Sequence, residues 1–230
     1  MKKRLICFAH RGASGHAPEN TLAAFRKAVE LGAEWIELDV YAVRGELLVI
    51  HDHRLERTTS GRGYVTRRGL DYLRSLDAGN GEKIPFLSEV LEAAARKVKI
   101  NIELKGPKTA APVCELLTHY VRRRGWRYDD FLLSSFEHRQ LRQAARLCPE
   151  IRVSPNLKGG RIRYDLGDVR PYSIHFDISY ATPEMIEKIH QRGCPAFVFT
   201  ANTLEDIRRL EAFGADGVFT NYPELITRMP

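Results

Sequence analysis

The sequence predicts an α/β protein, specifically a (β/α)₈ TIM barrel with a β-hairpin extension after the second strand. Short apolar, β-rich segments alternate with amphipathic helical segments along the whole chain, and no linker rich in Pro, Ser or Gly interrupts them. The 230 residues, 43% of them hydrophobic, are enough to bury a large core and exclude a disordered chain or a disulfide-stapled miniature. We therefore expect one domain spanning residues 1–230.

The predicted strands and helices follow each other in pairs. Eight segments are expected as strands: 5–9, 34–40, 99–105, 131–135, 151–155, 173–178, 196–201 and 216–220. Helices are expected at about 20–32, 69–76, 88–97, 109–124, 137–147, 183–192, 203–213 and 223–228. The fifth crossover, which contains Gly159 and Gly160, lacks a helical pattern. A doubly wound open sheet is the alternative, but no Gly-x-Gly-x-x-Gly turn follows the first strand to favour it.

The long connection after the second strand predicts the hairpin. Arg44-Gly45-Glu46 is a turn candidate midway between Asp39 and His51. A hairpin there makes residues 47–50 a return strand above the barrel and brings His51 back to the neighbourhood of Asp39. Residues 51–77 would then form a rim of the barrel.

Side-chain alternation indicates which strand residues face inward. In the second strand, Ile36, Leu38 and Val40 share one face, and Glu37 and Asp39 share the other. In the third, Asn101, Glu103 and Lys105 alternate with apolar residues in the same way, and His175 and Asp177 do so in the sixth. Because the apolar face should meet the helices, the polar residues should point into the barrel, at the end where barrel enzymes keep their active sites.

Glu37, Asp39 and Glu103 should converge on that rim. Three carboxylates suit a hard divalent cation, so we expect one Mg²⁺ or Ca²⁺ ion, with Mn²⁺ as a further candidate. The alternative is a set of internal ion pairs with Arg11 and Lys105.

Two histidines stand beside the carboxylates. His10 ends the first strand and His51 ends the return strand, so they could serve as general base and general acid. Arg11 and Lys105 are suited to hold an anionic oxygen. This combination favours phosphoryl chemistry. Asn20 is expected to cap the first helix, and Glu19 could support Arg11.

Several short motifs follow one another along the chain: His10-Arg11-Gly12, Pro18-Glu19-Asn20-Thr21, Glu37-Leu38-Asp39-Val40, His51-Asp52, Arg57-Thr58-Thr59-x-Gly61, Ile84-Pro85-x-Leu87-x-Glu89-Val90-Leu91 and Glu103-Leu104-Lys105. In order and spacing they resemble the glycerophosphodiester phosphodiesterase family, and the match continues to Asp216-Gly217-Val218-Phe219-Thr220 near the end of the chain.

This resemblance implies a metal-dependent barrel enzyme that hydrolyses glycerophosphodiesters to sn-glycerol 3-phosphate and an alcohol, through a cyclic phosphate. It implies His10 and His51 as the acid/base pair, with His10 assigned as base and His51 as acid. Glu37, Asp39 and Glu103 are implied as metal ligands, and Arg11 and Lys105 as phosphate contacts.

The sequence departs from the family pattern at two places in the pocket region. Phe199 stands where the family commonly has Trp, so a smaller ring should line the substrate-binding mouth. Asn221 stands where the pattern Thr-Asp-x-Pro has its Asp. Both changes could alter the choice of alcohol or the depth of the pocket.

Composition narrows the partners and the location. The net charge is +7, which we attribute mostly to surface arginines, and no nucleic-acid-binding motif accompanies it. No segment approaches the roughly 18–20 apolar residues of a membrane span, the run 5–9 is too short for a signal peptide, and the four cysteines are scattered. We expect a cytoplasmic enzyme of a small-molecule diester, without nucleic acid or stable membrane insertion. Its oligomeric state is left open.

Two other functions remain as alternatives. Lys105, at the end of a barrel strand, could form a Schiff base in a lyase. A basic barrel that binds polyanions without catalysis is the second.

Overall fold

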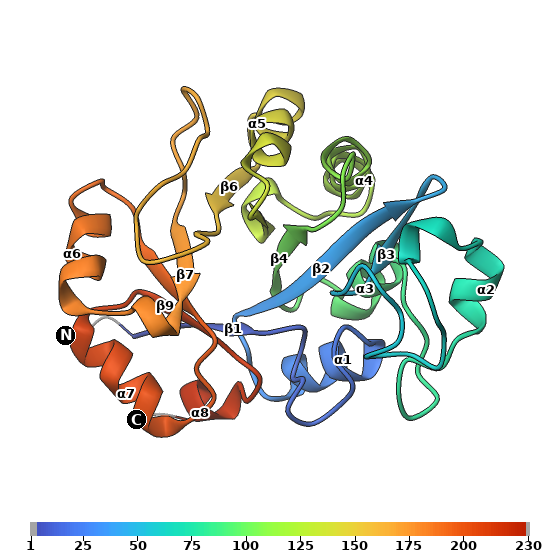
Figure 1. Ribbon diagram of the computed structural model, residues 1–230, viewed down its shortest axis with the longest axis horizontal. Helices are drawn as coiled ribbons and strands as arrows, with labels where there is room; N and C mark the ends of the chain where they lie inside the picture. The colour runs from blue at the N-terminus through green and yellow to red at the C-terminus, as the bar shows by residue number, and fades with distance from the viewer. Residues whose placement is uncertain (1–3, 229–230) are drawn as a thin grey trace.

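A computed structural model describes residues 4–228 of the chain, so the five terminal residues of the predicted domain 1–230 lie outside it. Eight parallel strands surround a central axis, and helices cover them on the outside (Figure 1). The barrel strands are β1 (Ile6–Ala9), β2 (Trp35–Val43), β4 (Lys99–Leu104), β5 (Phe131–Ser135), β6 (Arg152–Pro155), β7 (Ile174–Asp177), β8 (Ala196–Phe199) and β9 (Gly217–Thr220).

The strand order is that of a (β/α)₈ barrel. The strands follow each other as β6-β5-β4-β2-β1-β9-β8-β7. The remaining gap between β6 and β7 is spanned by a parallel bridge from Asn156 to His175 and by a 2.6 Å hydrogen bond between the hydroxyls of Ser154 and Ser173. The predicted TIM barrel is confirmed, and the open doubly wound sheet is excluded.

The helices lie close to their predicted positions. They are α1 (Leu22–Glu30), α2 (Leu70–Ser75), α3 (Leu87–Ala94), α4 (Ala110–Arg123), α5 (His138–Leu147), α6 (Pro183–His190), α7 (Leu204–Phe213) and α8 (Glu224–Thr227). Short 3₁₀ turns occur at Val65–Arg67, Tyr128–Asp130 and Ile178–Tyr180. As predicted, the described chain has no helix between β6 and β7.

The predicted hairpin extends one side of the barrel (Figure 1). Strand β3 (Glu46–Val49) pairs antiparallel with the end of β2, from Val40 with Val49 to Val43 with Glu46. The two turn residues, Arg44 and Gly45, have φ angles of 51° and 89°, which is the left-handed geometry that tight hairpin turns require. The hairpin and the rim segment share a separate apolar cluster, formed by Tyr41, Val43, Leu48, Ile50, Leu55, Val65, Leu73, Leu76, Ala78 and Ile84.

The two faces of the strands divide as expected. Ile36, Leu38 and Val40 belong to the large apolar core between strands and helices. Inside the barrel, a separate and mainly aromatic cluster fills the end at which the strands begin. It is built from Phe8, Trp35, Leu132, Phe197 and Phe219. Because these side chains close the barrel at that end, the polar residues further along the strands form the base of a cavity that opens only at the carboxyl ends of the strands.

Candidate active site

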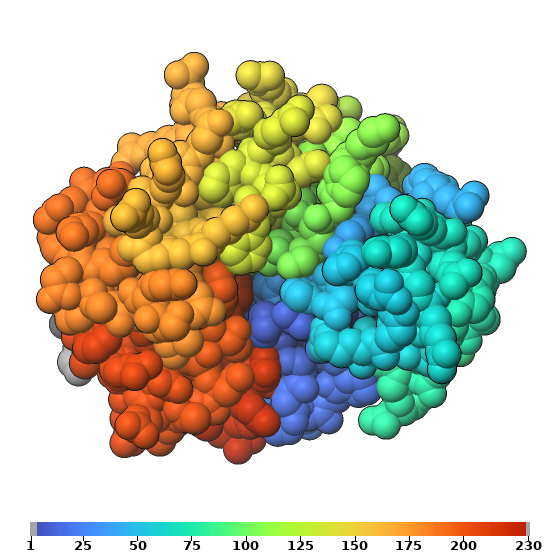
Figure 2. Space-filling model, viewed as in Figure 1, coloured from blue at the N-terminus to red at the C-terminus, as the bar shows by residue number. Residues whose placement is uncertain are grey.

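A cavity of about 280 Å³ opens at the carboxyl ends of the barrel strands. Figure 2 shows a hollow near the centre of this face, bordered by blue, cyan, green and orange-red segments. Most of the predicted site residues line the cavity: His10, Arg11, Glu37, His51, Glu103, Lys105, His175, Asp177 and Phe199. These residues are far apart in the sequence, but the carboxyl ends of parallel barrel strands meet at one rim and so bring them together.

Glu37, Asp39 and Glu103 form one acidic cluster. Each offers an oxygen, and these oxygens lie within 4.8 Å of one another. Asp39 and Glu103 are direct register partners of β2 and β4. Burial, together with the charges of Asp39 and Glu103, raises the pKa of Glu37 well above its ordinary value. Burial also raises the pKa of Glu103, to about 7. For Asp39, burial is outweighed by Lys105, His51 and Arg11, which lower its pKa.

This donor set fits a hard divalent cation. Lys105 Nζ lies 2.9 Å from Glu103 Oε1 and 3.6 Å from Asp39 Oδ1, and Arg11 Nε lies 3.6 Å from Asp39 Oδ2. The ion pairs that we considered as the alternative are therefore present in the chain. They involve two of the three carboxylates, whereas Glu37 accepts a hydrogen bond from the Arg11 amide at 2.9 Å, and Arg11 also pairs with Glu19 at 2.8 Å. The cluster thus offers more carboxylates than there are cations to pair with them, and its donors are all oxygens, as Mg²⁺ and Ca²⁺ require.

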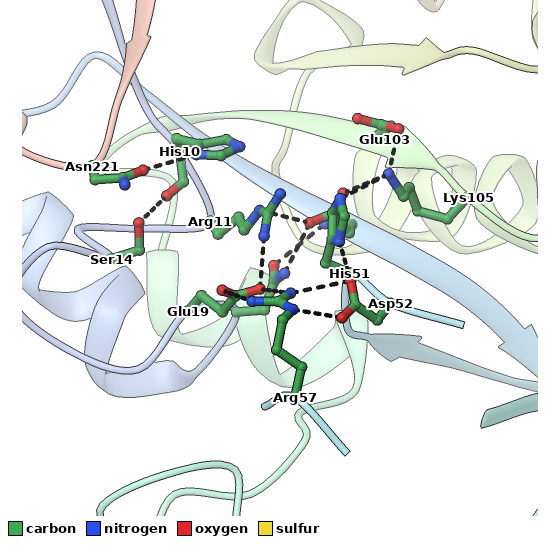
Figure 3. Close-up of polar contacts among 12 residues, drawn as sticks. His10, Arg11, Ser14, Glu19, His51, Asp52, Arg57, Glu103, Lys105 and Asn221 are labelled. Atoms are coloured by element: carbon green, nitrogen blue, oxygen red, sulfur yellow. Dashed lines mark hydrogen bonds and ion pairs between the residues drawn. The ribbon is translucent and has the colours of Figure 1, made fainter. Parts of the chain in front are cut away.

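The two histidines lie on opposite sides of the site (Figure 3). His10 Nδ1 is 2.8 Å from Asn221 Oδ1, and burial and the charge of Arg11 lower the pKa of His10 to about 4. His51 Nδ1 is 2.5 Å from Asp52 Oδ1, and its Nε2 is 3.1 Å from Lys105 Nζ. Burial lowers the pKa of His51 as well. Both imidazoles are therefore mainly neutral at pH 7.

An ion-pair network that the sequence did not reveal connects the residue that contacts His51 with the residue that contacts Arg11. The Arg57 guanidinium contacts both carboxylate oxygens of Glu19, at 2.7 and 2.8 Å, and its Nε lies 2.5 Å from Asp52 (Figure 3). Glu19 in turn holds Arg11, as predicted. A single exposed arginine thus connects the partner of His51 with the partner of Arg11.

Asn20 does not cap the first helix, contrary to our expectation. The Thr21 hydroxyl accepts the hydrogen bond from the Ala24 amide and is the cap. Asn20 adopts a positive φ of 57° and donates from Nδ2 to Asp39 Oδ2 at 2.9 Å, while the Asp39 amide donates back to its Oδ1 at 3.3 Å. Asn20 and Thr21 both have side chains that commonly cap helices, so the sequence alone could not decide between them. The buried carboxylate of Asp39 needs a hydrogen-bond donor, and Asn20 supplies it.

The base of the cavity carries buried polar groups without partners. Both side-chain polar atoms of Asn101, the Ser134 hydroxyl and Oδ1 of Asn156 make no hydrogen bond within the described chain. All three residues line the cavity and are at most 3% exposed. Leaving such groups unpaired is costly, so they are suited to receive hydrogen bonds from a ligand or from water in the cavity. Of these three, we predicted only the inward direction of Asn101.

Aromatic rings form one wall of the cavity. Phe199 packs edge-on against Phe136 and Phe219, with ring centroids 5.9 and 6.2 Å away. His175 lies below this wall and places Nε2 2.9 Å from the Ser173 hydroxyl. The wall and the polar base give the cavity two chemically different sides.

A (β/α)₈ barrel with an acidic cluster, two imidazoles and two cations at its carboxyl end defines a hydrolase of phosphoric diesters. Residues 10–225 match the Glycerophosphoryl diester phosphodiesterase family, and the chain belongs to this family. It is accordingly an enzyme with glycerophosphodiester phosphodiesterase activity.

The chain is similar to curated proteins and solved structures over almost its full length. A glycerophosphodiester phosphodiesterase from Caldanaerobacter subterraneus subsp. tengcongensis is 34% identical, over 98% of both chains. A phosphodiesterase from Oleispira antarctica, whose structure was solved in complex with the product sn-glycerol-3-phosphate, is 31% identical with a TM-score of 0.87, over 96% of this chain and 95% of that one. The glycerophosphodiester phosphodiesterase structure from Agrobacterium tumefaciens is 30% identical with a TM-score of 0.81, over 98% and 100%.

Residues 4–228 contain no helix that is both long and apolar enough to span a membrane.

Proposed function

We propose that the chain hydrolyses glycerophosphodiesters to sn-glycerol 3-phosphate and an alcohol, with one divalent cation and two histidines as acid and base. The observation that carries this proposal is the acidic cluster, with His10 and His51 on either side of it in one cavity. The product named in the Oleispira antarctica structure supports the choice of product.

Glu37, Asp39 and Glu103 would hold the cation, either Mg²⁺ or Ca²⁺. When bound, such an ion offsets negative charge on the phosphoryl group and makes a nearby hydroxyl more acidic. Arg11 and Lys105 are positioned to contact the phosphoryl oxygens, Arg11 through its planar fork and Lys105 as a point charge. Both side chains are already held in place, by Glu19 and Glu103 respectively.

His10 is the base in this mechanism. The amide oxygen of Asn221 accepts the hydrogen bond from Nδ1, which leaves Nε2 free to take the proton of the glycerol 2-hydroxyl. The hydroxyl oxygen then bonds to phosphorus, and the bond from phosphorus to the leaving alcohol breaks. A cyclic phosphate is formed, and water opens it in the second half-reaction.

His51 is the acid that protonates the leaving alcohol. In the free enzyme its Nε2 accepts from the Lys105 ammonium. Substrate phosphate would draw this ammonium to its own oxygens and free Nε2 to carry a proton. The carboxylates of Asp52 and Asp39 favour the protonated imidazole. In ring opening the roles reverse, with His51 accepting the proton of water and His10 returning its proton to the 2-oxygen.

The polar base of the cavity would receive the remaining glycerol hydroxyl. Asn101, Ser134 and Asn156 offer donors and acceptors that have no partner in the described chain. The aromatic wall that includes Phe199 would then face the carbon skeleton of the substrate.

The two alternatives fit the site less well. The carboxylates of Glu103 and Asp39 outweigh burial and raise the pKa of Lys105, so this lysine stays a protonated ammonium and is a poor Schiff-base nucleophile. A barrel that only binds polyanions has no need for three converging carboxylates beside two histidines. We also propose that the enzyme acts in the cytoplasm, in keeping with four free, buried thiols.

The test is the release of sn-glycerol 3-phosphate from glycerophosphocholine. We expect release with Mg²⁺ or Ca²⁺, its loss with EDTA, and its return when the cation is restored. The variants His10→Ala and Glu37→Gln should lose it. Undiminished turnover in either variant would contradict the assignment, and trapping of a carbonyl substrate on Lys105 by borohydride would support the lyase instead.

A further inference from the structure

We propose that a basic groove beside the active site binds an anionic group on the leaving alcohol, so that the enzyme prefers glycerophosphodiesters whose alcohol carries a second phosphate. The proposal rests on the function proposed above and adds the substrate class. It is carried by the position and the charge of the groove.

The groove lies between residues 105–108 and helix α5. Its volume is about 760 Å³, and Lys105 lines both this groove and the active-site cavity. From Lys105 it continues past Lys108 to Arg139, Arg142 and Arg146. The three arginines are spaced three and four residues apart, so they share one face of α5. The groove therefore begins at a predicted phosphate contact and continues along a row of cations.

Most of this positive charge is not neutralised. Arg142 pairs with Asp165, and Glu137, the acidic residue lining the groove, pairs with Lys158 at 3.1 Å. Lys108, Arg139 and Arg146 are exposed and make no ion pair with any residue in 4–228. Three uncompensated cations along one concave surface attract a multivalent anion more strongly than three isolated surface residues.

The geometry of the site directs the leaving alcohol towards this groove. His51, the proposed acid, must lie next to the leaving oxygen, and its Nε2 is 3.1 Å from Lys105 Nζ. The glycerol hydroxyl is expected at the polar base formed by Asn101, Ser134 and Asn156. The alcohol consequently leaves on the side of Lys105, where the groove begins.

Phosphate is the anion that the groove suits best. The arginine side chains offer forked donors that match phosphate oxygens, and Lys108 adds a point charge. A choline or ethanolamine head would bring a cation into the groove and gain nothing from these residues.

The experiment compares two substrates that differ by one phosphate, glycerophosphoinositol and glycerophosphoinositol 4-phosphate. The groove variant combines Lys108→Gln, Arg139→Gln and Arg146→Gln. Its control removes the same charge from exposed arginines on α1, α4 and α7, with Arg26→Gln, Arg122→Gln and Arg208→Gln. For each enzyme, the ratio of kcat/KM for the phosphorylated over the unphosphorylated substrate is measured at low and at high salt.

We expect the wild-type enzyme to favour the phosphorylated substrate. The groove variant should lower the ratio by roughly five- to tenfold, since each exposed ion pair contributes modestly. The control variant should keep the ratio, and 0.5 M NaCl should reduce it in the wild type because exposed charges are screened. If the triple variant misfolds, the single variants Arg139→Gln and Arg146→Gln, both on the exposed face of α5, should each lower the ratio by a smaller factor.

The possible failures are distinguishable. Hydrolysis of neither substrate by the wild-type enzyme would overturn the proposed function, and this inference with it. Hydrolysis of both substrates with a ratio that the groove variant leaves unchanged, or that the control variant lowers equally, would overturn the inference alone. Groove-dependent binding of a short single-stranded DNA that competes with the phosphorylated substrate would assign the groove to nucleic acid and would also overturn it.

Discussion

The Nδ1 atom of His10 lies 2.8 Å from Oδ1 of Asn221, so a neutral amide orients the histidine that we propose as base. An aspartate at this position would instead place a carboxylate beside the ring and stabilise the protonated imidazole. Burial and the charge of Arg11 lower the pKa of His10 to about 4, although the hydrogen bond to Asn221 opposes them, so this histidine stays unprotonated well below neutral pH.

Asn221→Asp should raise the pKa of His10. The negative charge favours the imidazolium, so the pH below which the base is protonated moves up, and the acidic limb of kcat/KM should shift to higher pH. Activity at pH 5–6 should fall relative to activity at pH 8, compared with the wild-type enzyme. The measurement is a pH profile for both proteins, with NMR titration of His10 as the direct readout. An unchanged acidic limb would contradict the assignment of His10 as base.

Arg57 should support His51, the proposed general acid, from outside the cavity. Its guanidinium holds Asp52, which contacts His51, and also Glu19, which contacts Arg11. Arg57→Gln removes charged hydrogen bonds from both residues at once. Because Arg57 is about half exposed, we expect a moderate loss, roughly tenfold in kcat/KM.

Arg54→Gln is the matched control for Arg57→Gln. Arg54 belongs to the same segment and also pairs with a glutamate, but its partner Glu56 does not contact the site residues. Its kcat/KM should stay within twofold of the wild type. Equal losses in the two variants would mean that the segment matters through its general stability rather than through Asp52 and Glu19.

Glu37→Gln should stabilise the metal-free protein while abolishing stabilisation by a cation. The pKa of Glu37 is raised in the folded state, so its contribution to stability is present at low pH and is lost as pH rises through that raised value. In EDTA at pH 8–9, the Tm of the variant should be a few degrees higher than that of the wild type, since each kcal/mol in the free energy of unfolding shifts Tm by about 2–4 °C. The difference should vanish towards pH 5.

Adding Mg²⁺ or Ca²⁺ should reverse that order. A ligand at a hundred times its Kd stabilises the folded state by about 2.7 kcal/mol, and only the wild type should gain this. Thermal unfolding of both proteins with and without the cation measures the effect, and the exposed Glu115→Gln is the control. Equal stabilisation of wild type and Glu37→Gln by the cation would exclude Glu37 as a ligand.

The barrel and the centre of the site could be predicted because both follow from short-range rules. Period-two alternation placed Glu37, Asp39 and Glu103 on the inward face, and the ends of parallel strands necessarily meet at one rim. The return of His51 to Asp39 followed from one turn signal, and the Ile50 amide donates to the Asp39 carbonyl at 2.9 Å. These inferences needed no knowledge of how loops pack.

The surroundings of the site could not be predicted in the same way. Arg57 lies on a loop whose path depends on the apolar cluster beneath the hairpin, so its bridge between Glu19 and Asp52 has no local signature. Asn156 enters the cavity through an isolated bridge where the barrel closes, after β6 has ended. Asn20 was placed wrongly because a local capping preference yielded to a buried carboxylate.

Asn101 should set the preference for glycerol over a smaller diol. Its amide has no partner in the described chain and faces the cavity, so we expect it to hydrogen-bond the glycerol hydroxyl that takes no part in the attack. The test substrate is the phosphocholine diester of propane-1,2-diol, which keeps the attacking 2-hydroxyl and lacks the other one. The wild type should favour glycerophosphocholine by about 5- to 100-fold in kcat/KM, because a missing hydroxyl leaves buried polar groups unpaired.

Asn101→Ala should remove most of this preference by lowering kcat/KM for glycerophosphocholine more than for the diol ester. If Asn101 instead shapes the acidic cluster, as the register neighbour of Glu37, the variant should lower kcat/KM for both substrates equally. Cation binding, followed by calorimetry, separates the two cases because a subsite for the hydroxyl leaves the cation affinity of the variant unchanged. A retained preference in Asn101→Ala would place the glycerol hydroxyl elsewhere, against the aromatic wall rather than at the polar base.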